Sequence, residues 1–272
     1  MKSKILGLAC FASLAALGTA QALETELQVG PDEFRVGGEL LNKHYSHGRV
    51  IHQDVTSHGS LDFRWYDVGI HLDGYIVLDG APGPRDTVIN DFEMTEVTGR
   101  LDYLFEVENY VQILPFVEST IYPYSQGASK FNWVGADVWY MLPWEGIEVG
   151  GSAQYNVSDN TEPEIRHDNH WLGSIGSRQF YQDAPIDLAF WQVVNMASRS
   201  YHEITTGADK QGATTLDLGA KLTMPLPWHE TWAFLKAEGH FYINSEDRQS
   251  LEATGGDKNE LVIGIGFEYR AE

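Results

Sequence analysis

The chain has 272 residues, and its 18 Lys and Arg against 39 Asp and Glu give a formal charge of −21 at pH 7. A surface this acidic repels nucleic acid, and it argues against a basic docking face for anionic lipid. The one cysteine, Cys10, lies in the first 22 residues, so the remaining chain has no disulfide framework, thiol nucleophile or Cys-ligated metal.

Residues 1–22 have the pattern of a secretory signal peptide. Two lysines precede an apolar run from Ile5 to Leu17, and an Ala-x-Ala cleavage site ends at Ala22. The apolar run is shorter than the roughly 20 residues that a membrane-spanning helix needs, so we expect cleavage. The sequence therefore predicts export through the Sec pathway and one mature domain over residues 23–272.

From residue 34 onward, apolar and polar side chains alternate, which is typical of strands with two unlike faces. In the last segment Leu261, Ile263 and Ile265 share one face, and Glu260 and Glu268 share the other. The pattern predicts twelve strands, at residues 34–42, 53–65, 68–78, 92–105, 111–123, 130–142, 147–156, 169–181, 187–197, 213–224, 231–243 and 258–270. Most are near the roughly 9 to 11 residues with which a tilted strand crosses a bilayer.

The connections between these segments alternate in length. Five are short, at 66–67, 106–110, 143–146, 182–186 and 225–230. Six are long, at 43–52, 79–91, 124–129, 157–168, 198–212 and 244–257. The asymmetry predicts an all-β fold, a transmembrane antiparallel up-and-down β-barrel of about 12 strands with short periplasmic turns and longer outer loops. Trp144 and Trp228, each at a short turn, fit an aromatic girdle at the lipid boundary.

A soluble β-barrel shows the same alternation with its apolar face inside. Number and length of strands favour the membrane barrel, because soluble up-and-down barrels usually close with about eight to ten strands. In a membrane barrel the apolar faces contact lipid and the charged faces line a wetted lumen, where opposite charges can pair across strands.

Acids outnumber bases on the expected inner face, which predicts a modest preference for cations. Ten residues are candidates for the lumen or its constriction: Glu96, Arg100, Asp102, Glu118, Asp137, Glu148, Asp217, Lys221, Lys236 and Glu238. The sequence thus indicates an outer-membrane, porin-like channel for passive diffusion of small polar or cationic solutes. The alternative is that ion pairs fill the lumen, which gives a non-conducting surface barrel with a structural, adhesive or ligand-binding role.

Two groups of residues have side chains that bind cations. Around the first outer loop, His44, His47, His52 and His58 can gather on Zn²⁺ or Cu²⁺, although their spacing matches no tight metal motif and loop histidines are usually solvated. Acids in the long loops can hold Ca²⁺ or Mg²⁺, or bridge to lipopolysaccharide through such ions, namely Asp79, Asp86, Asp159, Glu162, Glu164, Glu246 and Asp247. Apart from such loop-bound divalent cations, no cofactor is expected.

Ser–His pairs occur, but they do not predict an enzyme. Ser57 precedes His58 directly, and Ser46 precedes His47. Neighbours on a strand point to opposite faces, so they cannot act together as nucleophile and base. The motif of outer-membrane phospholipases, a His two residues before a Ser-Asn pair, is absent from the sequence.

Two stretches resemble known outer-membrane proteins. Gly264, Phe267 and Tyr269 have the Gly-x-x-aromatic-x-aromatic spacing of the C-terminal signal that the outer-membrane assembly machinery recognises, although here three residues follow the last aromatic. Residues 34–78, with the loop Lys43-His44-Tyr45-Ser46-His47-Gly48-Arg49 and the break Trp65-Tyr66-Asp67, resemble the opening of the TorF-like family of bacterial porins.

The same resemblance extends to residues 96–103 and to the Tyr122-Pro123-Tyr124 element. It implies a barrel and a pore in the bacterial outer membrane, without any solute specificity. The expected partners are accordingly outer-membrane lipid, lipopolysaccharide, the assembly machinery and small solutes, and no nucleic acid.

Overall fold

The structure is a computed structural model. It describes residues 34–46, 49–79, 81–82, 88–89, 91–108, 110–123, 129–143, 146–158, 170–183, 186–199, 201–202, 211–228, 230–253 and 257–271. The expected signal peptide, residues 1–22, lies outside these ranges. None of the described helices is long and apolar enough to cross a membrane.

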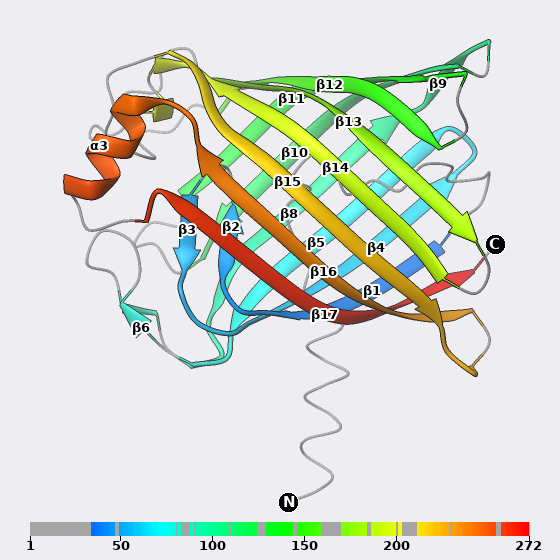
Figure 1. Cartoon of the computed structure of the whole chain (residues 1–272), viewed down its shortest axis with the longest axis horizontal. Helices are drawn as coiled ribbons and strands as arrows, with labels where there is room; N and C mark the ends of the chain where they lie inside the picture. Colours follow the sequence, from blue (N-terminus) through cyan, green and yellow to red (C-terminus); the bar gives the residue numbers. More distant parts are fainter. Residues whose placement is uncertain are drawn as a thin grey trace, which may run out of the picture.

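Antiparallel strands close into a 12-strand barrel (Figure 1). They are β1 Phe34–Leu41, β4 Thr56–Trp65, β5 Val68–Val77, β8 Met94–Tyr103, β9 Phe105–Val107, β10 Val111–Tyr122, β11 Ser129–Met141, β12 Ile147–Asn156, β13 Trp171–Asp183, β14 Ile186–Ala197, β15 Gly212–Pro225, β16 Thr231–Tyr242 and β17 Asn259–Ala271. β8 and β9 together form one position of the ring, because both pair with β10. The ring closes where β1 pairs with β17, from Phe34 opposite Ala271 to Leu41 opposite Gly264. The predicted fold class is confirmed, and a strand lies in each of the twelve predicted segments; the predicted connection 106–110 is shorter than expected, because β9 extends to Val107.

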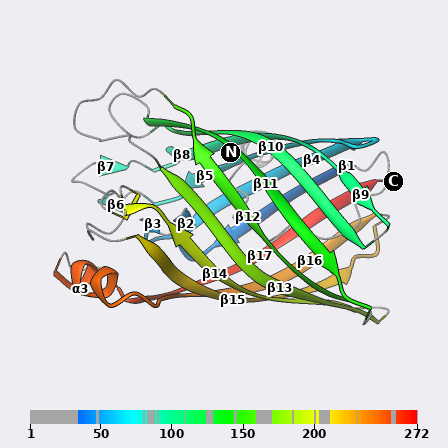
Figure 2. The ribbon, with the colours of Figure 1, turned by 90° about the horizontal axis from the view of Figure 1, so that it is seen from above.

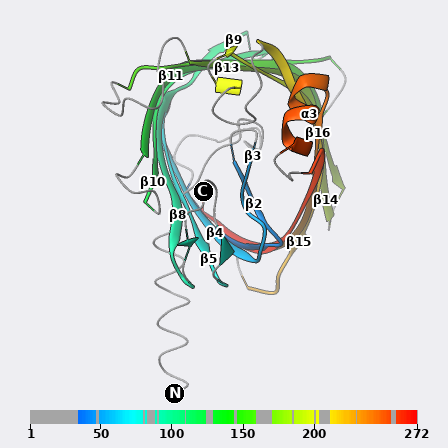
Figure 3. The same ribbon diagram turned by 90° about the vertical axis from the view of Figure 1, so that its left-hand side faces the viewer.

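Short turns and long connections lie at opposite ends of the barrel (Figures 1 and 2). Within the described residues, the long connections contain further elements that the alternation pattern did not predict: β2 His44–Ser46, β3 Arg49–His52, β6 Ala81–Pro82, β7 Val88–Ile89 and α3 Ser245–Ala253. Figure 3 looks onto the long-loop end and shows β2 and β3 within the outline of the ring. We call this pair of strands the inner hairpin.

The apolar faces point outward, as expected. Leu218 on β15 and Ile263 and Ile265 on β17 are 42%, 43% and 62% exposed. The charged faces point inward: Glu96 and Asp102 on β8 are almost fully buried. This arrangement suits a bilayer, because the closed sheet pairs the backbone groups of its strands and presents mainly apolar side chains to acyl chains. Trp228 is exposed at the short-turn end, where the aromatic girdle was expected; Trp144 lies outside the described residues.

The interior holds more than the charged residues that the sequence indicated. Large buried aromatic side chains also point inward, namely Phe116, Phe131, Trp133, Trp139, Trp191 and Phe234. Several lie against the wall over an inward-facing glycine. For example, ring atoms of Trp139 occupy the space that a side chain at Gly150 would take. The expected lining of charges alone is therefore incomplete.

Candidate functional site in the barrel interior

All ten lumen residues predicted from the sequence face the interior, and all are buried except Lys221, whose side chain is 16% exposed. They do not form one ring. The structure divides them among clusters on different parts of the wall, each joined by ion pairs and by contacts of cations with aromatic rings.

The first cluster spans β8, β10 and β11. The guanidinium of Arg100 donates a hydrogen bond to Asp137 at 2.5 Å and lies 3.8 Å above the ring of Phe116. Glu118 pairs in register with Arg100 on the neighbouring strand. Because Arg100 crosses over β10 to reach β11, its stem and the Phe116 ring cover this section of the wall.

Asp102 is the centre of a second network on β4, β5 and β8. It accepts a hydrogen bond from Arg64 at 2.7 Å, and its other oxygen is 2.6 Å from a ring nitrogen of His71. The second ring nitrogen of His71 is 2.7 Å from Asp62. His71 is not among the residues predicted from the sequence. Its place in the alternation, two residues from Asp73 on the charged face of β5, was a signal that would have found it.

On the opposite wall, Glu148 lies 3.6 Å from Arg178, and Arg178 stacks 3.5 Å above the ring of Trp139. Arg178 was also missed, although Glu148 and Arg178 are direct cross-strand partners. Stacking on an indole holds the guanidinium against the wall and compensates part of its lost hydration.

A fourth cluster joins β15, β16 and β17 to β1. Lys221 is 3.5 Å from Glu268 and 4.4 Å from the ring of Phe234. Further toward the long-loop end, Lys236 lies 3.9 Å from both Glu39 and Glu238.

Asp217 and Glu238 lie beside a third residue, His240, which is not among the residues predicted from the sequence. His240 lies 3.0 Å from Asp217 through Nδ1 and 4.0 Å from Glu238 through Nε2. One candidate ligand atom from each residue lies within 4.8 Å of the others. Tyr45 of the inner hairpin stacks on the His240 ring with centroids 3.6 Å apart.

The inner hairpin enters the barrel mouth and covers part of the wall. His44 is fully buried, makes a 3.1 Å hydrogen bond with Thr95 and lies 3.2 Å from Glu96. Its ring also stacks on Tyr75 at 3.8 Å. Tyr45, the neighbouring residue of the hairpin, is also buried. Burial raises the pKa of its hydroxyl well above the ordinary value, so Tyr45 stays neutral. The expectation of solvated loop histidines is therefore wrong for His44, because the loop folds inward.

The four candidate metal histidines are only partly brought together. His58 also stacks on Tyr75, at 4.4 Å, but its ring nitrogens lie 2.7 Å from Glu39 and 3.3 Å from Asp73. His44 and His58 thus share one tyrosine and contact different carboxylates. His47 lies outside the described residues, as does the side chain of His52. Metal binding by this set stays a prediction.

Of the acidic loop residues, Asp79 is exposed, and Asp247 is buried in the first turn of α3, 2.8 Å from His202. Glu246 lies in the same turn. The other four lie outside the described residues: Asp86, Asp159, Glu162 and Glu164. Cation binding by the outer loops also stays a prediction.

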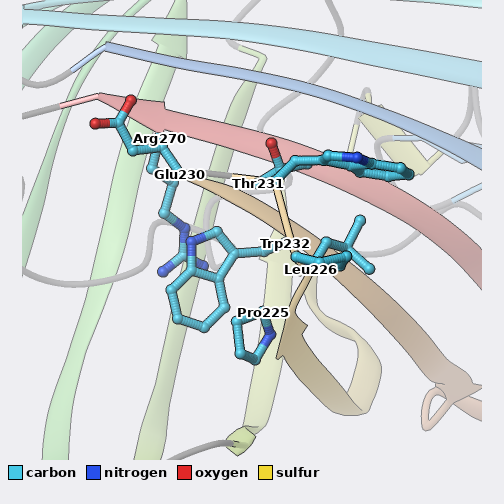
Figure 4. Close-up of a pocket in the computed structure, with 8 residues that line it drawn as sticks. Pro225, Leu226, Glu230, Thr231, Trp232 and Arg270 are labelled. Carbon is cyan, nitrogen blue, oxygen red and sulfur yellow. The ribbon is translucent and has the colours of Figure 1, made fainter.

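A pocket of about 740 Å³ lies beside the β15–β16 turn, at the short-turn end of the interior (Figure 4). Arg270 lies beside the inward-facing Trp232, with its guanidinium carbon 5.1 Å from the ring centroid. Glu230 lines the same pocket and accepts a 2.7 Å hydrogen bond from the hydroxyl of Tyr269.

No family model matches the chain, and no curated protein is similar to it in sequence. Among solved structures it is similar to the NanC porin, with 9% identity, a TM-score of 0.52 and coverage of 88% of this chain and 98% of that one. An outer-membrane channel from Pseudomonas putida F1 gives 14% identity, a TM-score of 0.49 and coverage of 93% and 100%.

The likeness to the NanC porin concerns the fold alone, that of a closed antiparallel β-barrel. The resemblance to the TorF-like family is not tested by these comparisons and stays a prediction.

Proposed function

We propose that the protein is a narrow channel of the bacterial outer membrane through which small polar or cationic solutes diffuse passively. The observation that carries this proposal is the charge of the interior. Among the described residues of the barrel strands, eleven buried acids stand against four buried Lys or Arg, namely Glu39, Asp73, Glu96, Asp102, Glu118, Asp137, Glu148, Asp217, Glu238, Glu260 and Glu268 against Arg64, Arg100, Arg178 and Lys236. Acidic walls of low dielectric concentrate cations and exclude anions.

The arrangement of the cationic side chains supports a path along the axis. Arg100, Arg178 and Lys221 each lie over an aromatic ring of the wall. With these cations held against the wall, carboxylate oxygens are the main charges that a passing solute would meet. A bore lined by such long side chains is narrow, so we expect a small unitary conductance.

The second candidate function, a non-conducting surface barrel, is favoured by one observation. The inner hairpin buries His44 and Tyr45 in the barrel mouth and fixes them by two ring stacks. In barrels of about eight strands, side chains fill the interior completely, whereas twelve strands enclose more space. Whether a path for solutes stays open in this barrel therefore depends on how much of that space the inner hairpin and the ion pairs occupy.

Recordings in planar bilayers separate the two functions. We expect stepwise currents and, in a salt gradient, a reversal potential of the sign for cation preference. Glu118→Gln removes a buried interior charge and should reduce this preference, whereas Glu252→Gln on the exposed part of α3 serves as the matched control. A correctly folded protein without steps would support the non-conducting barrel, and anion preference would contradict the proposed acidic path.

We further propose that the chain reaches the outer membrane through the Sec pathway and acts without a cofactor or enzymatic step. Fractionation of cells on a sucrose gradient tests the location, and N-terminal sequencing of the mature protein tests cleavage after Ala22. Solubility without detergent would contradict the membrane barrel.

A further inference from the structure

We propose that Asp217, Glu238 and His240 form a binding site for a divalent transition-metal ion inside the barrel. The three side chains are each more than nine-tenths buried. One ligand atom from each lies within 4.8 Å of the other two. Two carboxylates and an imidazole are a common ligand set for such ions.

Strand register brings the three residues together. Asp217 on β15 is the direct cross-strand partner of His240 on β16. Glu238 precedes His240 by two residues, so both side chains leave the strand on the same inner face. The site is therefore built on two adjacent, fully paired strands, which is a more rigid support than a loop.

Residues of the next strand hold the outer oxygens of both carboxylates. Asn195 donates a 2.5 Å hydrogen bond to Oδ2 of Asp217, and the indole N–H of Trp191 donates to Oε1 of Glu238 at 3.2 Å. The other oxygens, Oδ1 and Oε2, face His240. Hydrogen bonds of this kind fix the orientation of metal-ligating carboxylates in known sites.

Two buried atoms at the centre of the cluster have no hydrogen bond among the described residues. They are Nδ1 of His240 and Oδ1 of Asp217, which lie 3.0 Å apart. Two ligands of a tetrahedral ion, each about 2.1 Å from it, are themselves about 3.4 Å apart. A shared cation would therefore satisfy both atoms after they separate by a few tenths of an ångström.

The nearest competing cation is Lys236, whose Nζ lies 3.9 Å from Glu238. The same ammonium lies 3.9 Å from Glu39, which shares its charge. Oε2 of Glu238 faces both Lys236 and His240, so a dication bound there would share this carboxylate with the ammonium, and Asp217 would be the second anionic ligand. The imidazole favours Zn²⁺, Fe²⁺ or Mn²⁺ over Ca²⁺, which prefers a shell made only of oxygen.

The site also contacts the inner hairpin, because the Tyr45 ring stacks on His240. An ion bound there would fix the imidazole and, through it, the position of the hairpin in the mouth. This inference goes beyond the proposed function, since binding of a metal does not require that the barrel conduct.

Equilibrium dialysis of the purified mature protein in detergent against Zn²⁺, followed by elemental analysis, tests the site. We expect one tightly held zinc per chain, and loss of that zinc in His240→Gln and in Asp217→Asn. His71→Gln is the matched control, because His71 also lies between two carboxylates, Asp62 and Asp102, and should retain the zinc. Equal zinc in the wild type and His240→Gln would overturn the proposal.

Heat-modifiable migration on a detergent gel shows whether each variant has folded. If a variant does not fold, the wild-type protein alone still tests the site. Up to one equivalent of added Mn²⁺ should show no free-ion electron paramagnetic resonance signal, because the ion is bound. Addition of Zn²⁺ should then displace the Mn²⁺ and restore the signal. A full free-ion signal from the first addition would overturn the site. A protein that binds zinc but never conducts would contradict the channel and leave the metal site standing.

Discussion

The indole ring of Trp191 fills the space where a side chain at Gly219 would lie. The two residues are cross-strand partners on β14 and β15, and a Cβ placed on Gly219 would be 1.9 Å from Cε2 of the indole. The ring therefore lies flat against the wall and reaches Glu238 on the strand beyond. A glycine on the inner face thus determines where a large aromatic side chain lies.

Gly219→Ala should therefore displace the Trp191 ring and destabilise the barrel by about 1 to 3 kcal/mol, the usual range for overpacking a filled interior. Urea unfolding in lipid vesicles, followed by tryptophan fluorescence, measures the change. Gly173→Ala is the control, because the nearest heavy atom to its new Cβ lies at 3.4 Å. An equal loss in both variants would show that the ring is not confined by Gly219.

Leu218→Arg tests the outward orientation of the apolar face. Leu218 lies in the middle of β15 and is exposed, so the substitution should cost about 2 to 4 kcal/mol in a bilayer. Asn259→Arg, at the long-loop end of β17, places the same charge near water and should change stability by about 1 kcal/mol or less. Unfolding free energies in the same vesicles provide the comparison, and a reversed order would place lipid on the other face.

The strands could be predicted because each has one face of lipid-facing apolar residues and one face with charges. In β17 exposed and buried residues alternate strictly from Asn259 to Ile265, and the prediction of 258–270 matches Asn259–Ala271. The ion pair of Arg100 with Asp137 joins two strands that are not adjacent, so it follows from the reach of the guanidinium across β10 and not from sequence spacing. The two residues could be predicted as inward charges but not as partners.

The inward tryptophans could not be distinguished by hydropathy, because an indole suits both lipid and the interior. In β11, Trp133 and Trp139 point inward while Val134 and Val138 face lipid. The usable signal was parity: both tryptophans are an even number of residues from Asp137. The inner hairpin and α3 could not be predicted either, since their positions depend on tertiary contacts such as the stack of Tyr45 on His240.

Tyr45→Ala removes one ring stack of the inner hairpin and should raise the single-channel conductance. The expected increase is about twofold or more, because the hairpin then loses the stack that holds it against His240 of the wall. Phe92→Ala is the control, since Phe92 is exposed in another long connection. Unchanged conductance in Tyr45→Ala would mean that the hairpin does not limit the path.

Phe267→Ala tests the C-terminal assembly signal. Phe267 is half-exposed on the lipid face of β17, so its loss should affect recognition more than packing. We expect a severalfold lower amount of barrel in the outer membrane, measured by immunoblot, with normal refolding of the purified chain in detergent. Ile265→Ala on the same face is the control; a similar decrease there would indicate a general loss of apolar surface instead of a lost signal.

The seam between β1 and β17 makes the barrel dependent on the final thirteen residues that the structure describes, Asn259–Ala271. A chain that stopped before them would leave β16 and β1 with open rows of backbone donors and acceptors, and each such group left in hydrocarbon costs several kcal/mol. Nonsense mutations late in the gene should therefore abolish insertion as completely as early ones, since a barrel that lacks its last strand cannot close.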